Sequence, residues 1–195
     1  MSKTMLRILL LMLLAPVCWG ACDVSKFNVE EIRSKHVKFS AEPSESSAFN
    51  LLNAIPDRFC EFNTLYGYHK KAGPLYDTPL YNQFRELEKY IKPEFLIKKY
   101  VALASEAEWD ADSVNYLQYA YRGLLEKYPK QVIDEILSLP KGKSEVAIKF
   151  LFDGPHPSQK ILKGTDRDEI CNINAAFCDI LSHVENDLLK SDHHH

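Results

Sequence analysis

The sequence predicts an all-α fold, built as a bundle or a short solenoid of antiparallel helix hairpins and stapled by two disulfides. Apolar residues recur at helical spacing through most of the chain, prolines and glycines separate these stretches, and no stretch alternates convincingly like a β-strand. Four cysteines follow an apolar leader, an even number in a chain that is expected to be exported. We expect a single helical domain over residues 21–190, since about 175 residues can enclose a sizeable core.

Residues 1–20 have the layout of a secretory signal peptide. Lys3 and Arg7 supply the positive start, an apolar run follows over residues 8–14, and small residues up to Gly20 offer a cleavage site. The run is too short to span a bilayer as a helix, and no later stretch is long and apolar enough. We therefore expect no transmembrane segment.

Export predicts a periplasmic or secreted protein. The chain holds no Asn-x-Ser/Thr site, which favours a bacterial periplasm over a glycosylating route. An alternative makes Cys22 the attachment point of a lipid anchor, although Trp19 stands where a Leu-like residue is usual. Residues 191–195 are expected to be a polar tail or the remnant of a purification tag.

The charge of the chain argues against a nucleic-acid partner. Removing Lys3 and Arg7 with the leader leaves 22 of the 24 basic residues against 27 acidic ones, a net charge of −5. Binding to a phosphate backbone needs clustered Lys and Arg side chains. No nucleic-acid partner is therefore expected.

The first third of the chain predicts short helices. Residues 21–44 indicate one or two helical turns near 29–34, and two further helices are expected over 45–54 and 57–67, separated by Pro56.

The middle of the chain predicts helices that prolines interrupt. A helix over 79–91 has apolar residues at one helical face, and Pro93 breaks it and opens the next helix, which runs to Ala104. Asp112 or Ser113 is expected to cap a helix through Tyr128, and the following segments predict a helix over 130–139 and a short helix capped by Ser144.

Two of these units resemble each other. Residues 83–103 and 118–139 both contain a glutamine, then Glu-Lys-Tyr, then a proline break and a closing leucine, at offsets of 35 to 38 residues. Such a pattern is typical of stacked helix hairpins, and a compact bundle of short hairpins is the alternative.

The C-terminal segment predicts one continuous amphipathic helix. Its apolar stripe consists of Ile170, Ile173, Phe177, Leu181, Val184 and Leu188. In one helix, Cys171 and Cys178 would lie about 10 Å apart along the axis, whereas a disulfide needs Cα atoms within about 7 Å. We therefore expect each of them to pair with Cys22 or Cys60, with the two long-range connectivities left open.

The segment around His156 is the most unusual in the chain. Gly154 permits a left-handed backbone, and Pro155 and Pro157 stiffen the chain on both sides of His156. A stiff loop loses little entropy on binding, so Asp153, Gly154, Pro155, His156 and Pro157 are candidate partner-binding residues. A plain helix connection is the alternative, in which Asp153 caps a turn.

Tyr119 is a further candidate binding residue. It falls off the apolar stripe of its predicted helix, and exposed tyrosines suit protein recognition because the ring adds contact area with few rotors. Helix packing is the alternative for most of the ten tyrosines.

The sequence shows no catalytic motif, and neither a metal site nor a cofactor is expected. The acidic group Glu106, Glu108, Asp110 and Asp112 lacks the glycine and the closing carboxylate of an EF-hand, so a solvated loop is expected there.

We therefore predict an exported binding protein, in preference to an enzyme, that contacts a protein partner through residues 153–157, as an inhibitor or immunity-type protein would. One alternative is a hydrolase-like enzyme with a dispersed site that joins His156 to Asp153 or to an acid of residues 106–112. The other is a structural helical-repeat scaffold.

Overall fold

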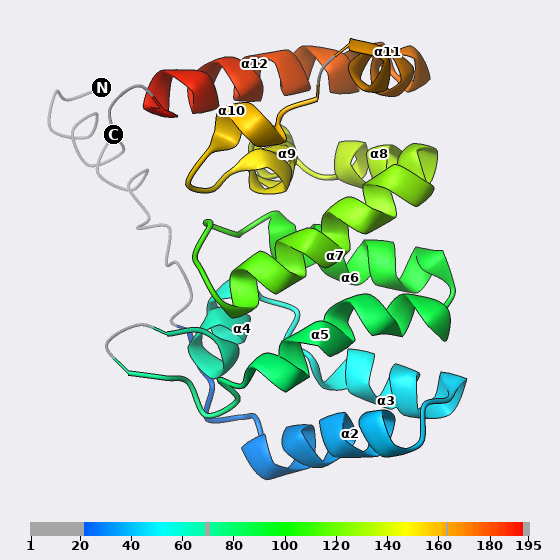
Figure 1. Ribbon diagram of the computed structural model, residues 1–195, viewed down its shortest axis with the longest axis vertical. Coiled ribbons are helices and arrows are strands. Elements are labelled where there is room, and N and C mark those ends of the chain that lie inside the picture. The colour runs from blue at the N-terminus through cyan, green and yellow to red at the C-terminus, as the bar shows by residue number, and fades with distance from the viewer. Residues whose placement is uncertain (1–21, 69–70, 163, 193–195) are drawn as a thin grey trace, which may run out of the picture.

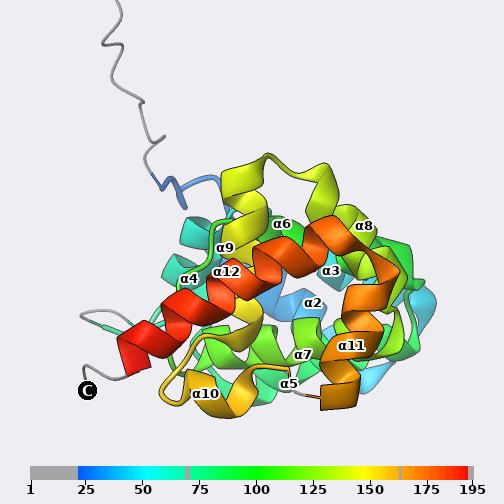
Figure 2. The ribbon, with the colours of Figure 1, turned by 90° about the horizontal axis from the view of Figure 1, so that it is seen from above.

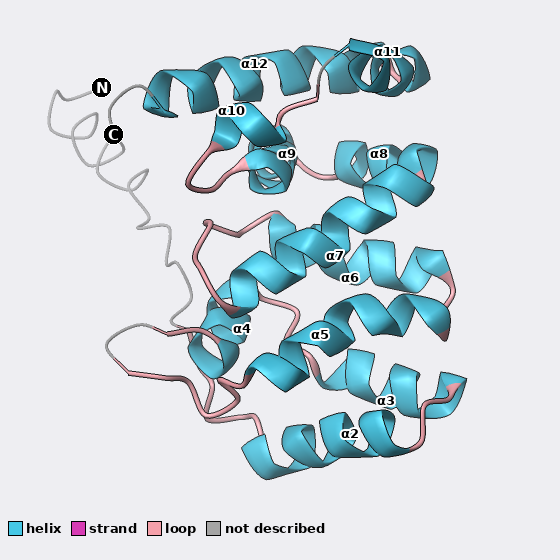
Figure 3. Cartoon of the chain, in the orientation of Figure 1, coloured by secondary structure: helices cyan, strands magenta, loops and turns pink. Residues whose placement is uncertain are grey.

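The structure is a computed structural model that describes residues 22–68, 71–162 and 164–192. Within these ranges the chain is helical, with loops and one isolated bridge between Tyr68 and Ala72 (Figure 3). The prediction of an all-α fold is confirmed. The predicted leader, residues 1–20, and residues 193–195 of the predicted tail lie outside the described residues.

The helices follow one another along the chain with short connections. In chain order they are α2 (Val29–Ala41), α3 (Glu45–Ala54), α4 (Phe59–Tyr66), α5 (Thr78–Glu86), the 3₁₀ turn η1 (Leu87–Lys89), α6 (Pro93–Ala104), α7 (Ser113–Lys127), α8 (Pro129–Ser138), α9 (Lys141–Phe152), α10 (Pro157–Lys160), α11 (Gly164–Ile173) and α12 (Ala175–Asp192).

Helix pairs stack along the long axis of the molecule (Figure 1). α2 and α3 pair at one end, α5 packs on α7, α6 packs on α8, and α9 supports α12 at the other end. Seen from above, α12 lies across the top of the stack (Figure 2). The two units of similar sequence fall in α5–α6 and α7–α8, and they stack helix on helix in the same order.

Several predicted helix boundaries have a visible local cause. Ser44 caps α3, because its hydroxyl accepts a hydrogen bond from the Ser47 backbone and the Ser47 side chain accepts one from the Ser44 backbone. Pro93 and Pro129 occupy the first positions of α6 and α8, where the missing N–H costs nothing. The predicted proline breaks therefore fall at the observed helix starts.

The predicted cap at Ser144 is wrong. α9 begins at Lys141, with Pro140 in the capping position, so Ser144 lies inside the helix. Its hydroxyl is buried and donates to the backbone oxygen of Ile136 at 2.8 Å, which ties α9 to α8. The same side chain therefore joins two helices instead of starting one.

Aromatic rings fill the centre of the stack. The rings of Phe62, Tyr66 and Phe84 lie 5.0–5.5 Å apart and are fully buried. The Tyr81 hydroxyl donates to the Tyr66 backbone oxygen at 2.8 Å, and the Tyr100 hydroxyl donates to that of Phe84. Tyr81 and Tyr100 therefore add buried apolar area while their hydroxyls are satisfied.

A buried polar group joins α2, α4 and α5. His36 is fully buried, with Nδ1 at 2.9 Å from the Gln83 side-chain oxygen and Nε2 at 2.8 Å from the Tyr66 hydroxyl. The pKa of His36 is lowered to about 4, chiefly by burial and to a lesser extent by Arg33, although the Gln83 hydrogen bond and Asp77 act to raise it. His36 is therefore neutral at pH 7.

The predicted single C-terminal helix is wrong, and so is the cysteine pairing that rested on it. The helix breaks at Asn174, whose side-chain oxygen accepts hydrogen bonds from the backbone of Ala176 and Phe177 and starts α12. The bend brings the Cα atoms of Cys171 and Cys178 to 4.9 Å, and the two residues form a disulfide. Both are thus unavailable to Cys22 and Cys60.

Candidate binding surface on α7

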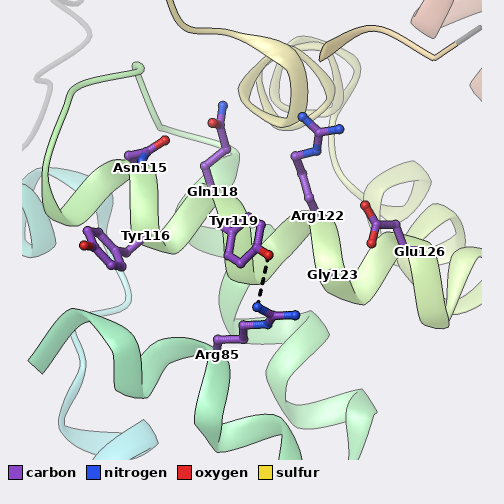
Figure 4. A pocket seen from close by; sticks show the side chains of 8 residues that line it. All are labelled: Arg85, Asn115, Tyr116, Gln118, Tyr119, Arg122, Gly123 and Glu126. Carbon is purple, nitrogen blue, oxygen red and sulfur yellow. Dashed lines mark hydrogen bonds between the residues drawn. The ribbon is translucent and has the colours of Figure 1, made fainter. Parts of the chain in front are cut away.

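The outer face of α7 carries a pocket of about 380 Å³ that opens to solvent. Its lining residues come from α7 and from one position of α5: Arg85, Asn115, Tyr116, Gln118, Tyr119, Arg122, Gly123 and Glu126 (Figure 4). The predicted binding residue Tyr119 lies in the middle of this set. We call these eight residues the α7 pocket.

Tyr119 is exposed but held in place. Its side chain is 57% exposed, and the Arg85 guanidinium lies 4.7 Å from the ring centroid and donates a hydrogen bond to the hydroxyl at 3.0 Å. Figure 4 shows the two side chains pointing toward each other across the gap between α7 and α5. The cation–π contact and the hydrogen bond restrict a ring that helix packing alone would leave free.

Gly123 leaves a gap in the side chains along α7. A Cβ atom at this position would meet no atom within 4 Å, so packing does not require a glycine. A glycine inside a helix costs about 1 kcal/mol relative to alanine. Gly123 therefore lowers the stability of α7 where it lines the α7 pocket, and packing gives no reason for a glycine there.

Gln118 connects the α7 pocket to the predicted binding loop. Its amide group is buried and donates to the backbone oxygens of Phe150 and Asp153, the latter at 2.9 Å. Arg122 lies on the same side of α7, with its guanidinium 5.9 Å from the Phe152 ring. Figure 4 shows Gln118 and Arg122 projecting away from Arg85, toward the end of α9. The loop thus begins at the edge of the pocket.

The loop itself has the geometry that its composition predicts. Gly154 has φ 139°, which side chains rarely adopt, and its backbone N–H donates to the Asp153 carboxylate at 2.8 Å. Pro155 and His156 are exposed, whereas Pro157 is buried as the first residue of α10. Asp153 therefore serves the turn, and the residues that face solvent are Pro155 and His156.

The acids of residues 106–112 and His156 do not line the same pocket. Glu106, Glu108 and Asp110 line a different pocket, together with Cys22 and Cys60, and His156 does not line it. Glu106 also contacts Arg58 at 3.9 Å and Lys143 at 3.1 Å, so it is engaged elsewhere.

Within the described residues, no group of three or more His, Cys, Asp or Glu side chains could hold a metal ion.

A row of tyrosine rings leads to the α7 pocket from the loop before α5. Tyr68, Tyr76, Tyr81 and Tyr116 form successive ring contacts with centroids 5.5–6.0 Å apart, and Tyr116 lines the pocket beside Tyr119. Tyr68 and Tyr76 are exposed. A hydrogen bond to Asp112 raises the pKa of the Tyr76 hydroxyl. Sequence reasoning assigned most tyrosines to packing, and only the spatial arrangement shows this row.

Seven of the eight residues of the α7 pocket were not predicted as binding residues: Arg85, Asn115, Tyr116, Gln118, Arg122, Gly123 and Glu126. A glycine in the middle of a strongly periodic helix is the one signal that the sequence offers, because it contradicts the local helix propensity. Arg85 lies 34 residues before Tyr119, and nothing in either segment indicates that they meet.

Comparison of the chain with protein-family models, with curated proteins and with solved structures finds no significant match. Among the helices of the described residues, none is long and apolar enough to cross a membrane.

Proposed function

We propose that this is an exported helical binding protein that contacts a protein partner through one surface, made by the α7 pocket and the exposed residues of the 153–157 loop. The observation that carries the proposal is the position of Gln118. Its buried amide holds the start of the loop against α7, so the loop begins beside a residue that lines the same pocket as Tyr119.

The chemistry of this surface supports a protein partner. Tyrosine and arginine are enriched among the residues that dominate binding energy in protein interfaces. Tyr119 is held by Arg85, and the loop is stiffened by Pro155 and by the Asp153 turn, so little side-chain or backbone freedom is lost when a partner binds. The surface is thus exposed and ordered at the same time.

Gly123 supports the same conclusion. The absence of a side chain lets another backbone approach α7 closely between Tyr119 and Glu126, and packing within the chain does not use that space. A partner segment that occupies it would compensate for the local loss of helix stability.

The test is a comparison of two glycine substitutions in full-length protein that has been exported and purified. Gly123→Gln places a side chain in the pocket without introducing a poor helix former, and we expect it to abolish capture of the partner from an extract of the source organism. Gly142→Gln is the matched control, because a Cβ atom there also meets no atom within 4 Å, but Gly142 lies on α9, outside the pocket. If both variants retain capture, the α7 pocket is not the binding surface.

A second candidate function is a structural scaffold, which the stacking of α5 on α7 and of α6 on α8 favours. For a scaffold, capture of the partner should depend on the tyrosine row and not on the loop. His156→Ala changes an exposed side chain and separates the two: it weakens capture if the loop takes part and leaves capture unchanged for a scaffold.

A further inference from the structure

Cys22, the first residue that the structure describes, lies beside Cys60 of α4. The Cys22 sulfur is 3.5 Å from the Thr64 hydroxyl, and that hydroxyl donates to the backbone oxygen of Cys60, one helical turn earlier on α4, at 2.7 Å. Both cysteines line the same pocket, and the Cys22 thiol is a hydrogen-bonding neighbour of the Cys60 thiol. The fold thus brings together two cysteines that lie 38 residues apart in the sequence.

The segment that carries Cys22 is anchored independently of any covalent bond. Lys26 contacts the buried carboxylate of Glu61 at 2.6 Å, and Glu61 is the residue that follows Cys60. Asp23 accepts hydrogen bonds from the backbone and the hydroxyl of Ser25, which closes a turn between Cys22 and Lys26. The ion pair and the turn fix the register of this segment on α4.

We propose that Cys22 and Cys60 form a second disulfide in the exported protein and that it joins the N-terminal segment to α4. This pairing replaces the long-range pairings expected from the sequence, because Cys171 and Cys178 are already joined to each other. The protein would then carry two disulfides, one that joins the N-terminal segment to α4 and one that joins α11 to α12.

The reaction is a thiol–disulfide exchange with a disulfide oxidant, such as the disulfide of an oxidised oxidoreductase or glutathione disulfide. The Cys22 thiolate attacks one sulfur of the oxidant, whose other sulfur leaves as a thiolate; the Cys60 thiolate then attacks Cys22, and the second oxidant sulfur leaves. Two electrons pass to the oxidant, and the two protons of the protein thiols end on the departing thiols.

The environment of the two thiols sets this order. Cys22 is exposed, whereas Cys60 is partly buried. Burial, and then the neighbouring Cys22, raise the pKa of Cys60 to about 11, so Cys60 is a poor first nucleophile. Cys22 therefore meets the oxidant first, and Cys60 resolves the mixed disulfide.

The experiment uses the full chain, exported and then treated with N-ethylmaleimide before denaturation, so that free thiols are blocked. Peptide mapping by mass spectrometry without reductant is expected to recover a peptide pair joined through Cys22 and Cys60, and neither residue alkylated. Recovery of both residues as maleimide adducts, of either one joined to Cys171 or Cys178, or of Cys22 carrying a lipid on its sulfur, would overturn the proposal.

Kinetics test the role of the fold in the pairing. The reduced, folded protein is oxidised with glutathione disulfide, and Lys26→Met is expected to slow formation of the Cys22–Cys60 bond several-fold. Lys130→Met is the matched control, since it removes an exposed ion pair with Asp134 elsewhere, and it should leave the rate unchanged. Cys60→Ser is expected to accumulate glutathione on Cys22, whereas Cys22→Ser should accumulate far less on Cys60. Equal accumulation in both variants would refute the proposed order.

Discussion

The Gln83 side chain and the His36 imidazole fix each other's orientation inside the core. The Gln83 amide nitrogen donates to the His36 backbone oxygen, which can only accept, so the Gln83 amide oxygen must face the ring. His36 Nδ1 therefore carries the proton and donates to Gln83, and Nε2 accepts from the Tyr66 hydroxyl. One backbone carbonyl thus determines the tautomer of a buried histidine.

This arrangement predicts that stability falls in mild acid. The pKa of His36 is about 4 in the folded protein and about 6.5 in an unfolded chain, so the unfolded state takes up the proton first. The stability is complete above pH 6.5 and is lost as the pH falls toward 4, by at most about 3 kcal/mol. Urea unfolding between pH 4 and pH 7.5 measures the slope.

Two histidine variants test whether His36 causes this pH dependence of stability. His36→Gln is expected to remove most of the pH dependence, whereas His183→Gln, at an exposed position on α12, should retain it. An unchanged slope in the His36 variant would show that other groups control acid stability.

Gln118→Leu is expected to lower the free energy of unfolding by about 1–3 kcal/mol, because the backbone oxygens of Phe150 and Asp153 lose buried hydrogen bonds. Thermal or urea unfolding measures the loss. Asn115→Leu, at an exposed position on the same helix, should change stability by less than about 0.5 kcal/mol. Equal stability of the two variants would mean that the loop is not held by Gln118.

Substitution of glycine by alanine should change the free energy of unfolding in opposite directions at Gly123 and at Gly73. Gly123→Ala is expected to raise the free energy of unfolding by about 0.5–1 kcal/mol, since the helix gains propensity and no atom is in the way. Gly73→Ala should destabilise the protein, because its Cβ atom would collide with the backbone oxygens of Leu65 and Thr64. A loss of stability at Gly123 would contradict the open environment described for it.

Removing the C-terminal disulfide should cost stability only under oxidising conditions. Cys171→Ser is expected to lower the free energy of unfolding by about 2–3 kcal/mol, as for other disulfides that close short loops. In the presence of a reductant, the variant and the parent should unfold alike. A difference that persists with the reductant would place the effect in packing around Cys171.

Local signals were sufficient to predict most helices. The proline at the start of α6 and the one at the start of α8 mark boundaries, and the apolar stripe of α7 matches the residues that are buried, such as Val114, Leu117 and Tyr121. These features depend on neighbours within one or two turns, which the sequence shows directly.

The features that the sequence missed depend on the relative placement of helices. The apolar stripe continues across Asn174, so the periodicity of Ile170, Ile173 and Phe177 does not reveal the bend that allows the disulfide. The α7 pocket likewise depends on α5 lying beside α7, and this places Arg85 against Tyr119. Local composition does not show which distant segments of the chain will contact each other.

At Gly123, where a side chain would meet no other atom, selection for folding and selection for binding can be told apart. In the aromatic core, a sequence change harms folding and activity together, so their effects are confounded. At Gly123, most small side chains would leave folding intact or improve it. Persistence of glycine there during divergence would therefore report pressure from a contact with another molecule, and free drift to alanine would report that no such pressure exists.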